Sequence, residues 1–105
     1  MVRGEVRRLR IPRDRRGSEQ HGARFAVIVQ ADELLALSTV IVAPTSRSAP
    51  ARSFRPLIEI GGEATRVLVE QMTAVSAERL GKSAGRLSAP ELRAVDEALA
   101  VVLGL

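Results

Sequence analysis

The residues of this sequence best suited to chemistry are one arginine and two adjacent hydroxyl residues. Arg24 directly precedes an apolar run, and Thr45 and Ser46 directly follow another. If these two runs pair as antiparallel strands, the three side chains meet at one edge of a sheet. A guanidinium offers a planar fork for phosphate oxygens, and hydroxyls add further donors. Such a set could bind a phosphodiester and stabilise the charge of a pentacovalent transition state.

Two polar loops, at 11–23 and 46–53, open at the same predicted edge. The first of them carries four more candidate polar side chains, Ser18, Glu19, Gln20 and His21. Each candidate also has an ordinary structural interpretation. Arg24 fits an exposed residue before a strand, Thr45 and Ser46 fit turn residues, and a histidine beside a loop glycine is more often exposed than catalytic. No single residue therefore carries a functional prediction.

The composition excludes several classes of site. The 105 residues contain no cysteine and one histidine, so a disulfide framework, a thiolate nucleophile and a cysteine or multi-histidine metal site are all excluded. The longest apolar stretch, at 98–103, is far shorter than the roughly 20 residues of a membrane span. The first residues lack the apolar run of a secretory signal. We expect a soluble, cytoplasmic protein with a single domain over 1–105, no metal and no cofactor.

Positive charge is concentrated at the start of the chain. Lysine and arginine number 16 against 12 acidic residues, and the first 24 residues hold eight arginines against three carboxylates. Nucleic acid or an acidic protein segment would suit this charge. A coding bias towards arginine is the alternative explanation, since 15 of the 16 basic residues are arginine.

The elements that must position these residues are mostly short strands. A first strand is predicted at 4–9, with Val6 and Leu9 inward and arginines outward. Apolar runs predict buried strands at 25–29 and at 39–43, the second ended by Pro44, in a register that places residue 25 opposite residue 44. A helical turn is predicted at 32–37. Strands at 57–60 and 66–72 would be joined by a glycine-led connection at 61–65, and the glycines of 74–87 favour short strands and turns.

The last segment is predicted to be a helix. Ser88 and Glu91 have the spacing of a capping box, and Pro90 lies in the first turn. Apolar residues then recur on one face, at Leu92, Val95, Leu99, Val102 and Leu103, and Gly104 ends the helix. The predicted fold class is a mainly β domain with a C-terminal helix, built as a small antiparallel barrel.

The motifs, taken in order, resemble those of the MazF/PemK toxin family. They are RGEV at 3–6, GSEQ at 17–20, RFAVIVQ at 24–30, TVIVAPTS at 39–46, VEQ at 69–71, AV at 74–75, RLGK at 79–82 and the segment from GRLS at 85–88 to the end. The resemblance covers nearly the whole chain. It implies an SH3-like barrel that forms a homodimer. It also implies the toxin of a type II toxin–antitoxin system, an mRNA interferase that cleaves single-stranded RNA at short sequences without metal. A cognate antitoxin would lay a disordered acidic segment across the dimer groove.

The resemblance also implies residue roles. The catalytic arginine matches Arg24, which would stabilise the phosphorane and assist proton transfer, and the catalytic hydroxyl matches Thr45, which would hold the scissile phosphate. The 2′-hydroxyl of the RNA is then the nucleophile. Glu70 matches a position close to the site. The residues expected to bind RNA are Ser18, Glu19, Gln20, His21, Ser46, Arg47 and Gln71.

The sequence departs from the family pattern at two positions. Arg7 stands where an aromatic residue, often tryptophan, usually follows Gly-Glu-Val, and Phe25 stands where proline usually follows the arginine. Loss of an aromatic platform removes about 1–3 kcal/mol per stacked base in other systems, and Arg7 would replace it with a phosphate contact. The alternatives are a non-catalytic relative that binds nucleic acid or antitoxin, and an inhibitor of a protein such as gyrase.

Overall fold

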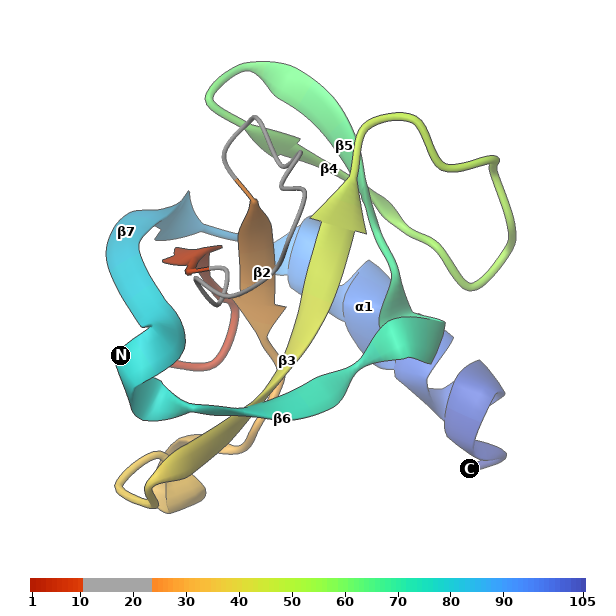
Figure 1. Ribbon diagram of the computed structural model, residues 1–105. Helices are drawn as coiled ribbons and strands as arrows, with labels where there is room; N and C mark the ends of the chain where they lie inside the picture. The colour runs from red at the N-terminus through yellow and green to blue at the C-terminus, as the bar shows by residue number, and fades with distance from the viewer. Residues whose placement is uncertain (11–23) are drawn as a thin grey trace, which may run out of the picture.

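The computed structural model describes residues 1–10 and 24–105, which form a curled antiparallel sheet with one helix across its back (Figure 1). The strands are β1 (Glu5–Leu9), β2 (Phe25–Ile28), β3 (Thr39–Ser46), β4 (Leu57–Ile60), β5 (Glu63–Val67), β6 (Thr73–Ser76) and β7 (Leu80–Arg86). Three single 3-10 turns are η1 (Asp32–Leu34), η2 (Val69–Gln71) and η3 (Ala77–Arg79), and the helix is α1 (Ala89–Leu103). The predicted fold class is confirmed, and so are the turn after β2 and the short strands of 74–87.

Strand β3 is the longest strand and the centre of the sheet. The order along the sheet is β4-β5-β3-β2-β1-β7, and β6 pairs with β3 outside this path. One edge of β3 pairs with β2, whereas its other edge pairs first with β6, at 39–42, and then with β5, at Thr45 and Ser46. Because β3 changes partner along its length, the sheet curls around it.

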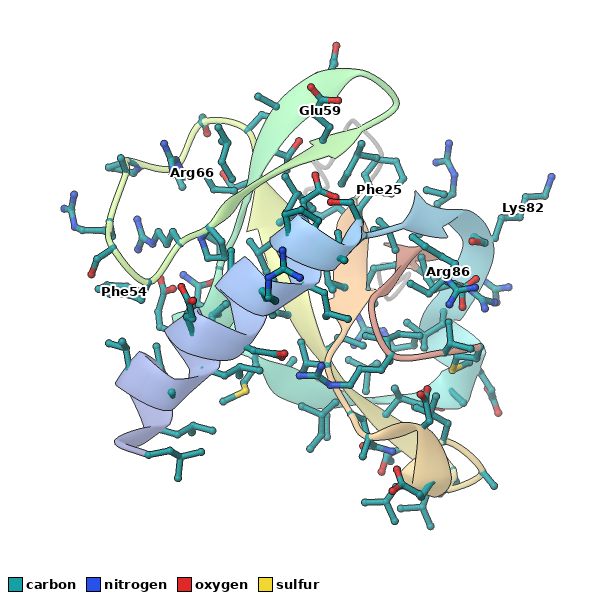
Figure 2. The ribbon with its side chains drawn as sticks, turned by 180° about the vertical axis from the view of Figure 1, so that it is seen from behind. Phe25, Phe54, Glu59, Arg66, Lys82 and Arg86 are labelled. Atoms are coloured by element: carbon teal, nitrogen blue, oxygen red, sulfur yellow. The ribbon has the colours of Figure 1, made fainter. Side chains whose placement is uncertain are left out.

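Strand β2 is buried on both faces, as its apolar run predicts. Val27 belongs to a cluster that includes Val95 and Ala98 of α1, and Ala26 and Ile28 belong to a second cluster on the other face. All three β2 residues are fully buried. Phe25 and Phe54 pack against the first cluster, towards different ends of α1 in Figure 2. The two clusters are built mostly from valine and isoleucine, which suit a half-barrel of short strands.

Pro44 does not end β3, contrary to the prediction. The strand continues to Ser46, and Pro44 lies opposite Ala26. Proline lacks the N–H that a ladder requires, but Pro44 falls between the β6 and β5 pairings of β3. Its carbonyl accepts a hydrogen bond from Leu68 N–H at 2.8 Å. The missing donor therefore coincides with the change of partner and interrupts neither pairing.

Two other predicted boundaries are wrong. The connection between β4 and β5 is a two-residue turn, Gly61-Gly62, rather than the longer segment 61–65. Both glycines have positive φ, 60° and 85°, which a tight hairpin requires and which side chains disfavour. The strand predicted at 66–72 ends at Val67, and Val69–Gln71 form η2 instead. Leu68 turns the chain there because its N–H is held by Pro44.

Helix α1 begins and ends as predicted. Ser88 Oγ accepts a hydrogen bond from Glu91 N–H at 3.2 Å, and Ser88 N–H donates to Glu91 Oε1 at 2.8 Å. Glu91 Oε2 also accepts from Glu59 N–H at 2.9 Å, which ties the first turn to β4. Leu103 was predicted to be on the buried face but is 52 % exposed, because the last turn extends beyond the sheet (Figure 1). Gly104 ends the helix with φ 73°.

Within residues 1–10 and 24–105, the structure contains no helix with the length and apolar character needed to cross a membrane.

Replacing Ser88 with alanine tests the helix cap. The variant loses the acceptor for Glu91 N–H, so we expect the free energy of unfolding to fall by about 1 kcal/mol and the melting temperature by roughly 4–8 °C. Thermal unfolding followed by circular dichroism measures both. Ser38→Ala, at an exposed serine outside the helix, is the control and should leave the melting temperature within about 1 °C. Equal effects of the two variants would contradict the capping role.

Candidate active site

The candidate site lies where β2 begins and β3 ends, at neighbouring positions of the sheet. The register pairs Ala26 with Pro44 and Val27 with Ala43. Continued outward, it places Phe25 opposite Thr45 and Arg24 opposite Ser46. The predicted register, with residue 25 opposite residue 44, is wrong by one residue. The expected gathering of an arginine and two hydroxyl residues at one edge remains, but a different hydroxyl faces the arginine.

The side chain of Gln30 completes this register at the inner end of the strand pair. It is buried between the two strands, where Nε2 donates to Leu34 O at 2.7 Å and Oε1 accepts from Ile41 N–H at 3.0 Å. Val29 N–H in turn donates to Ile41 O at 3.1 Å. A side-chain amide thus takes the place of a main-chain partner at the end of the ladder. The hydrophobic pattern and the loop length do not reveal that a side-chain amide replaces a main-chain hydrogen-bond partner here.

Arg24 is exposed and its main chain is fixed. The Arg24 carbonyl accepts a hydrogen bond from Leu9 N–H at 2.9 Å, which anchors the residue to β1. In the part of the chain that the structure describes, no carboxylate forms an ion pair with its guanidinium. The side chain therefore projects from a rigid strand end, as an arginine that receives a phosphate should.

The two hydroxyl residues are half-buried and differ in their hydrogen bonds. Thr45 Oγ1 donates to Phe25 O at 3.1 Å, across the strand pair. Ser46 Oγ instead accepts from Ser48 N–H at 3.3 Å, within its own loop. The main chain of both residues is held by β5, where Thr45 pairs with Val67 and Ser46 with Arg66. The site is thus framed by three strands.

Arg47 is the next residue along the chain and lies at the exposed rim. Its guanidinium forms an ion pair with Glu63, the first residue of β5, and the two side chains are 69 % and 61 % exposed. Because the pair is open to water, its net stabilisation is small, of the order of 0–1 kcal/mol. Arg47 is therefore placed beside Ser46 with a cationic group that another anion can reach.

A second ion pair organises the loop of residues 47–56. Arg55 Nη2 and Nε contact Glu70 Oε2 at 2.7 and 3.0 Å, and Arg55 Nη1 donates to Pro50 O at 3.0 Å. The guanidinium also lies 5.7 Å from the centre of the Phe54 ring. Arg55 and Glu70 are largely buried, so this contact anchors the loop to η2. No sequence signal pointed to Arg55 or to its pairing with Glu70.

Glu70 has a pKa below its ordinary value, chiefly because Arg55 donates hydrogen bonds to its carboxylate, an effect that outweighs burial. Gln71, expected to bind RNA, lies next to it in η2 and is exposed. Among the hydrogen bonds of the described residues, none joins Gln71 to Arg24, Thr45 or Ser46. The structure therefore gives Glu70 a structural partner, and Gln71 stays a predicted RNA contact on an element that packs against β3.

Arg7, which departs from the family pattern, is turned towards the protein. Its Nε donates to Gly81 O at 2.6 Å and its Nη1 lies 3.4 Å from Glu5 Oε1. Only 20 % of the side chain is exposed, so the prediction that the arginines of this strand point outward is wrong for Arg7. Burial raises the pKa of Glu5, but hydrogen bonds from Ser83 and Val2 and the charge of Arg7 together bring it below its ordinary value. These contacts tie β1 to β7 and favour a structural role over the phosphate contact expected of Arg7.

The remaining predicted residues, Ser18, Glu19, Gln20 and His21, lie outside the described residues. In the described ranges, no group of three or more histidine or acidic side chains is arranged to hold a metal ion.

Comparison with known proteins identifies the family. The sequence model described as "PemK-like, MazF-like toxin of type II toxin-antitoxin system" matches residues 2–103. The chain belongs to this family. Two curated relatives come from Mycobacterium tuberculosis. The candidate toxin Rv3098A is 36 % identical over 100 % of this chain and 99 % of its own length. Endoribonuclease MazF9 is 34 % identical over 100 % and 98 % of the two chains.

Solved MazF structures share the fold. A mycobacterial endoribonuclease, solved in complex with its cognate antitoxin, superposes with a TM-score of 0.81 at 18 % identity, covering 100 % of this chain and 96 % of the other. MazF from Deinococcus radiodurans gives 0.78 at 19 % identity, with 100 % and 97 % covered. The curled sheet with a C-terminal helix is therefore the MazF fold.

The Arg55–Glu70 pair predicts an acid-dependent loss of stability. A carboxyl whose folded pKa is lowered stabilises the fold above its unfolded pKa, about 4.3, and loses that contribution as the pH falls through the lowered value. Glu70→Gln should therefore be less stable than the wild type at pH 7 and approach it as the pH falls below about 4. Urea unfolding at several pH values measures this. Glu97→Gln, at an exposed residue of α1, is the control, and a pH-independent difference for Glu70→Gln would contradict the interpretation.

Proposed function

We propose that this MazF-type toxin is a metal-independent endoribonuclease, which cleaves single-stranded RNA at the rim formed by the start of β2 and the end of β3. The observation that carries the proposal is the exposed Arg24 on a fixed strand end, at the same end of the β2–β3 pair as Thr45 and Ser46. It is supported by the family match over 2–103 and by the relative MazF9, an endoribonuclease 34 % identical over the whole chain.

The proposed reaction is an internal transesterification. The RNA 2′-oxygen forms a bond to the neighbouring phosphorus, the bond from phosphorus to the 5′-oxygen breaks, and the 2′-hydroxyl proton is lost while the leaving oxygen gains one. The products are a 2′,3′-cyclic phosphate and a 5′-hydroxyl. Because the substrate supplies the nucleophile, the protein has only to orient the phosphate, stabilise its added charge and assist proton transfer.

Arg24 is the residue to which we assign charge stabilisation. Its planar guanidinium can donate two parallel hydrogen bonds to the equatorial oxygens of the phosphorane. Thr45 is the second residue of the site, and we assign its hydroxyl to the scissile phosphate. In the structure that hydroxyl donates a hydrogen bond to Phe25 O. Binding of RNA would therefore replace the Phe25 carbonyl with a phosphate oxygen as the acceptor. Arg47, at the rim, would contact a flanking phosphate.

We also propose two protein partners. The first is a second copy of the chain, supported by the exposed apolar side chains at the end of the helix, where Val101 is 63 % and Leu105 is 90 % exposed. The second is a cognate antitoxin with an acidic segment, supported by the net charge of +4 and by the antitoxin complex of the mycobacterial structural relative. Since the substrate is cellular RNA, we place the toxin in the cytoplasm.

Substitution of the two site residues tests the assignment. With purified protein and an RNA oligonucleotide in EDTA, we expect Arg24→Ala and Thr45→Ala each to lower the cleavage rate by about 10²-fold or more, because each removes a donor to the developing charge. Arg24→Lys should be intermediate, since a point charge replaces the planar fork.

The matched control is Arg93→Ala, at an exposed arginine of α1, which should cleave at the wild-type rate. Circular dichroism checks that every variant is folded. Wild-type turnover by folded Arg24→Ala would contradict the assignment, and absence of RNA cleavage by the wild type would contradict the proposed function. A topoisomerase assay would then test the inhibitor alternative.

The source of the nucleophile has its own test. Primer extension first locates the cut, and a 2′-deoxy nucleotide is then placed on its 5′ side. We expect cleavage to disappear while the dissociation constant, measured by fluorescence polarisation, changes by less than about threefold, since one hydroxyl contributes little to ground-state binding of an oligonucleotide. Cleavage of the deoxy substrate would contradict attack by the 2′-hydroxyl.

A further inference from the structure

The register of β2 and β3 separates the two hydroxyls of the candidate site. Residues directly opposite each other in an antiparallel pair lie on the same face of the sheet, and successive residues alternate. Ser46 therefore shares the face of Arg24. Thr45 starts from the opposite face, where its cross-strand neighbours Phe25 and Val67 pack in the cluster under α1. Its hydroxyl can therefore reach the phosphate bound by Arg24 only around the end of β2, where Oγ1 already contacts Phe25 O. Of the two hydroxyl residues, the one directly across from the arginine is Ser46.

The hydroxyl protons are also engaged differently. A carbonyl oxygen can only accept, so the contact between Thr45 Oγ1 and Phe25 O uses the Thr45 proton. Ser46 Oγ accepts from Ser48 N–H, and a hydroxyl that accepts one hydrogen bond keeps its own proton for donation. No acceptor for that proton is found among the described residues. The Ser48 N–H thus orients Ser46 as a donor without consuming its hydrogen.

We propose that Ser46 is a further catalytic residue, which donates a hydrogen bond to a non-bridging oxygen of the phosphate that Arg24 binds. The inference rests on the proposed endoribonuclease function. Together the two residues present a planar guanidinium and a hydroxyl from facing positions on adjacent strands, so their spacing is set by the strand pair. Ser46 needs no exchange of hydrogen bonds to act, whereas Thr45 has to release Phe25 O first.

Kinetics of matched serine variants test the role of Ser46. In full-length protein, Ser46→Ala should lower kcat by about 10- to 10²-fold with little change in KM, because the bond strengthens as charge develops on the oxygen. Ser46→Thr keeps the hydroxyl and should retain most of the rate. The control is Ser38→Ala, at an exposed serine before the other end of β3, which should match the wild type.

A phosphorothioate at the cleaved phosphate separates a direct contact from a structural effect. Sulfur accepts hydrogen bonds poorly, so the wild type should cleave one of the two phosphorothioate diastereomers more slowly than the oxygen substrate. Ser46→Ala should lose that difference, because the contact is already missing. Wild-type kcat in Ser46→Ala, or an unchanged thio effect in that variant, would overturn the inference while leaving the endoribonuclease function intact. A wild-type protein that cleaves no RNA would overturn both.

Discussion

The side chain of Gln30 is the constraint on which the candidate site depends. Its amide donates a hydrogen bond to Leu34 O and accepts one from Ile41 N–H, and so ties the end of β2 to β3 next to the main-chain bond from Val29 N–H to Ile41 O. Strand β3 then carries β6 on its first half and β5 on its second half. A shift of one residue would move every side chain of β2 to the opposite face relative to β3. Such a shift would bury Arg24 or move it away from Ser46. The buried amide of Gln30 therefore influences how Arg24 and Ser46 are positioned at the other end of the strand pair.

The polar residues of the candidate site lie at the ends of β2 and β3, whose central residues are apolar. Both faces of β2 are covered, so a charged residue within it would lose its hydration without a partner. Arg24 and Ser46 lie just beyond that buried length, where the main chain is still rigid and water is accessible. The arginine at position 7 obeys the same rule inside the fold, because it is buried only together with Glu5 and the Gly81 carbonyl. The exposed Arg24, to which we assign a catalytic role, and the mostly buried Arg7, which has a structural role, thus differ in their exposure to water.

Local sequence signals were sufficient for the elements that pack by periodicity. The strands β1 and β2, the hairpin of β4 and β5 and the capped helix α1 follow from apolar spacing, glycines and the Ser88–Glu91 pair. The register could not be obtained in this way, because it depends on side-chain bonds of Gln30 to the main chain. The same holds for Pro44, which is tolerated within β3 only because the strand changes partner there, and for η2, which is stabilised by tertiary contacts with Pro44 and Arg55. The sequence therefore predicted which residues gather at this edge of the sheet. It did not predict which hydroxyl residue lies opposite Arg24.

The exposure of Glu63 is compatible with the proposed binding of a polyanion at the same rim. Glu63 pairs with Arg47 at the rim, yet both side chains are mostly in water, where such a pair contributes about 0–1 kcal/mol. If RNA binds as proposed, a phosphate could displace Glu63 from Arg47 at little cost in free energy and gain a contact whose strength depends on salt. Glu70, by contrast, is held by two hydrogen bonds from Arg55 in a largely buried position. Removing Arg55 would leave this partly buried carboxylate without the partner that lowers its pKa, a larger penalty than the loss of the exposed pair. In the proposed function the exposed Arg47–Glu63 pair is therefore the one that RNA would replace, whereas the Arg55–Glu70 pair would keep the loop of residues 47–56 in place.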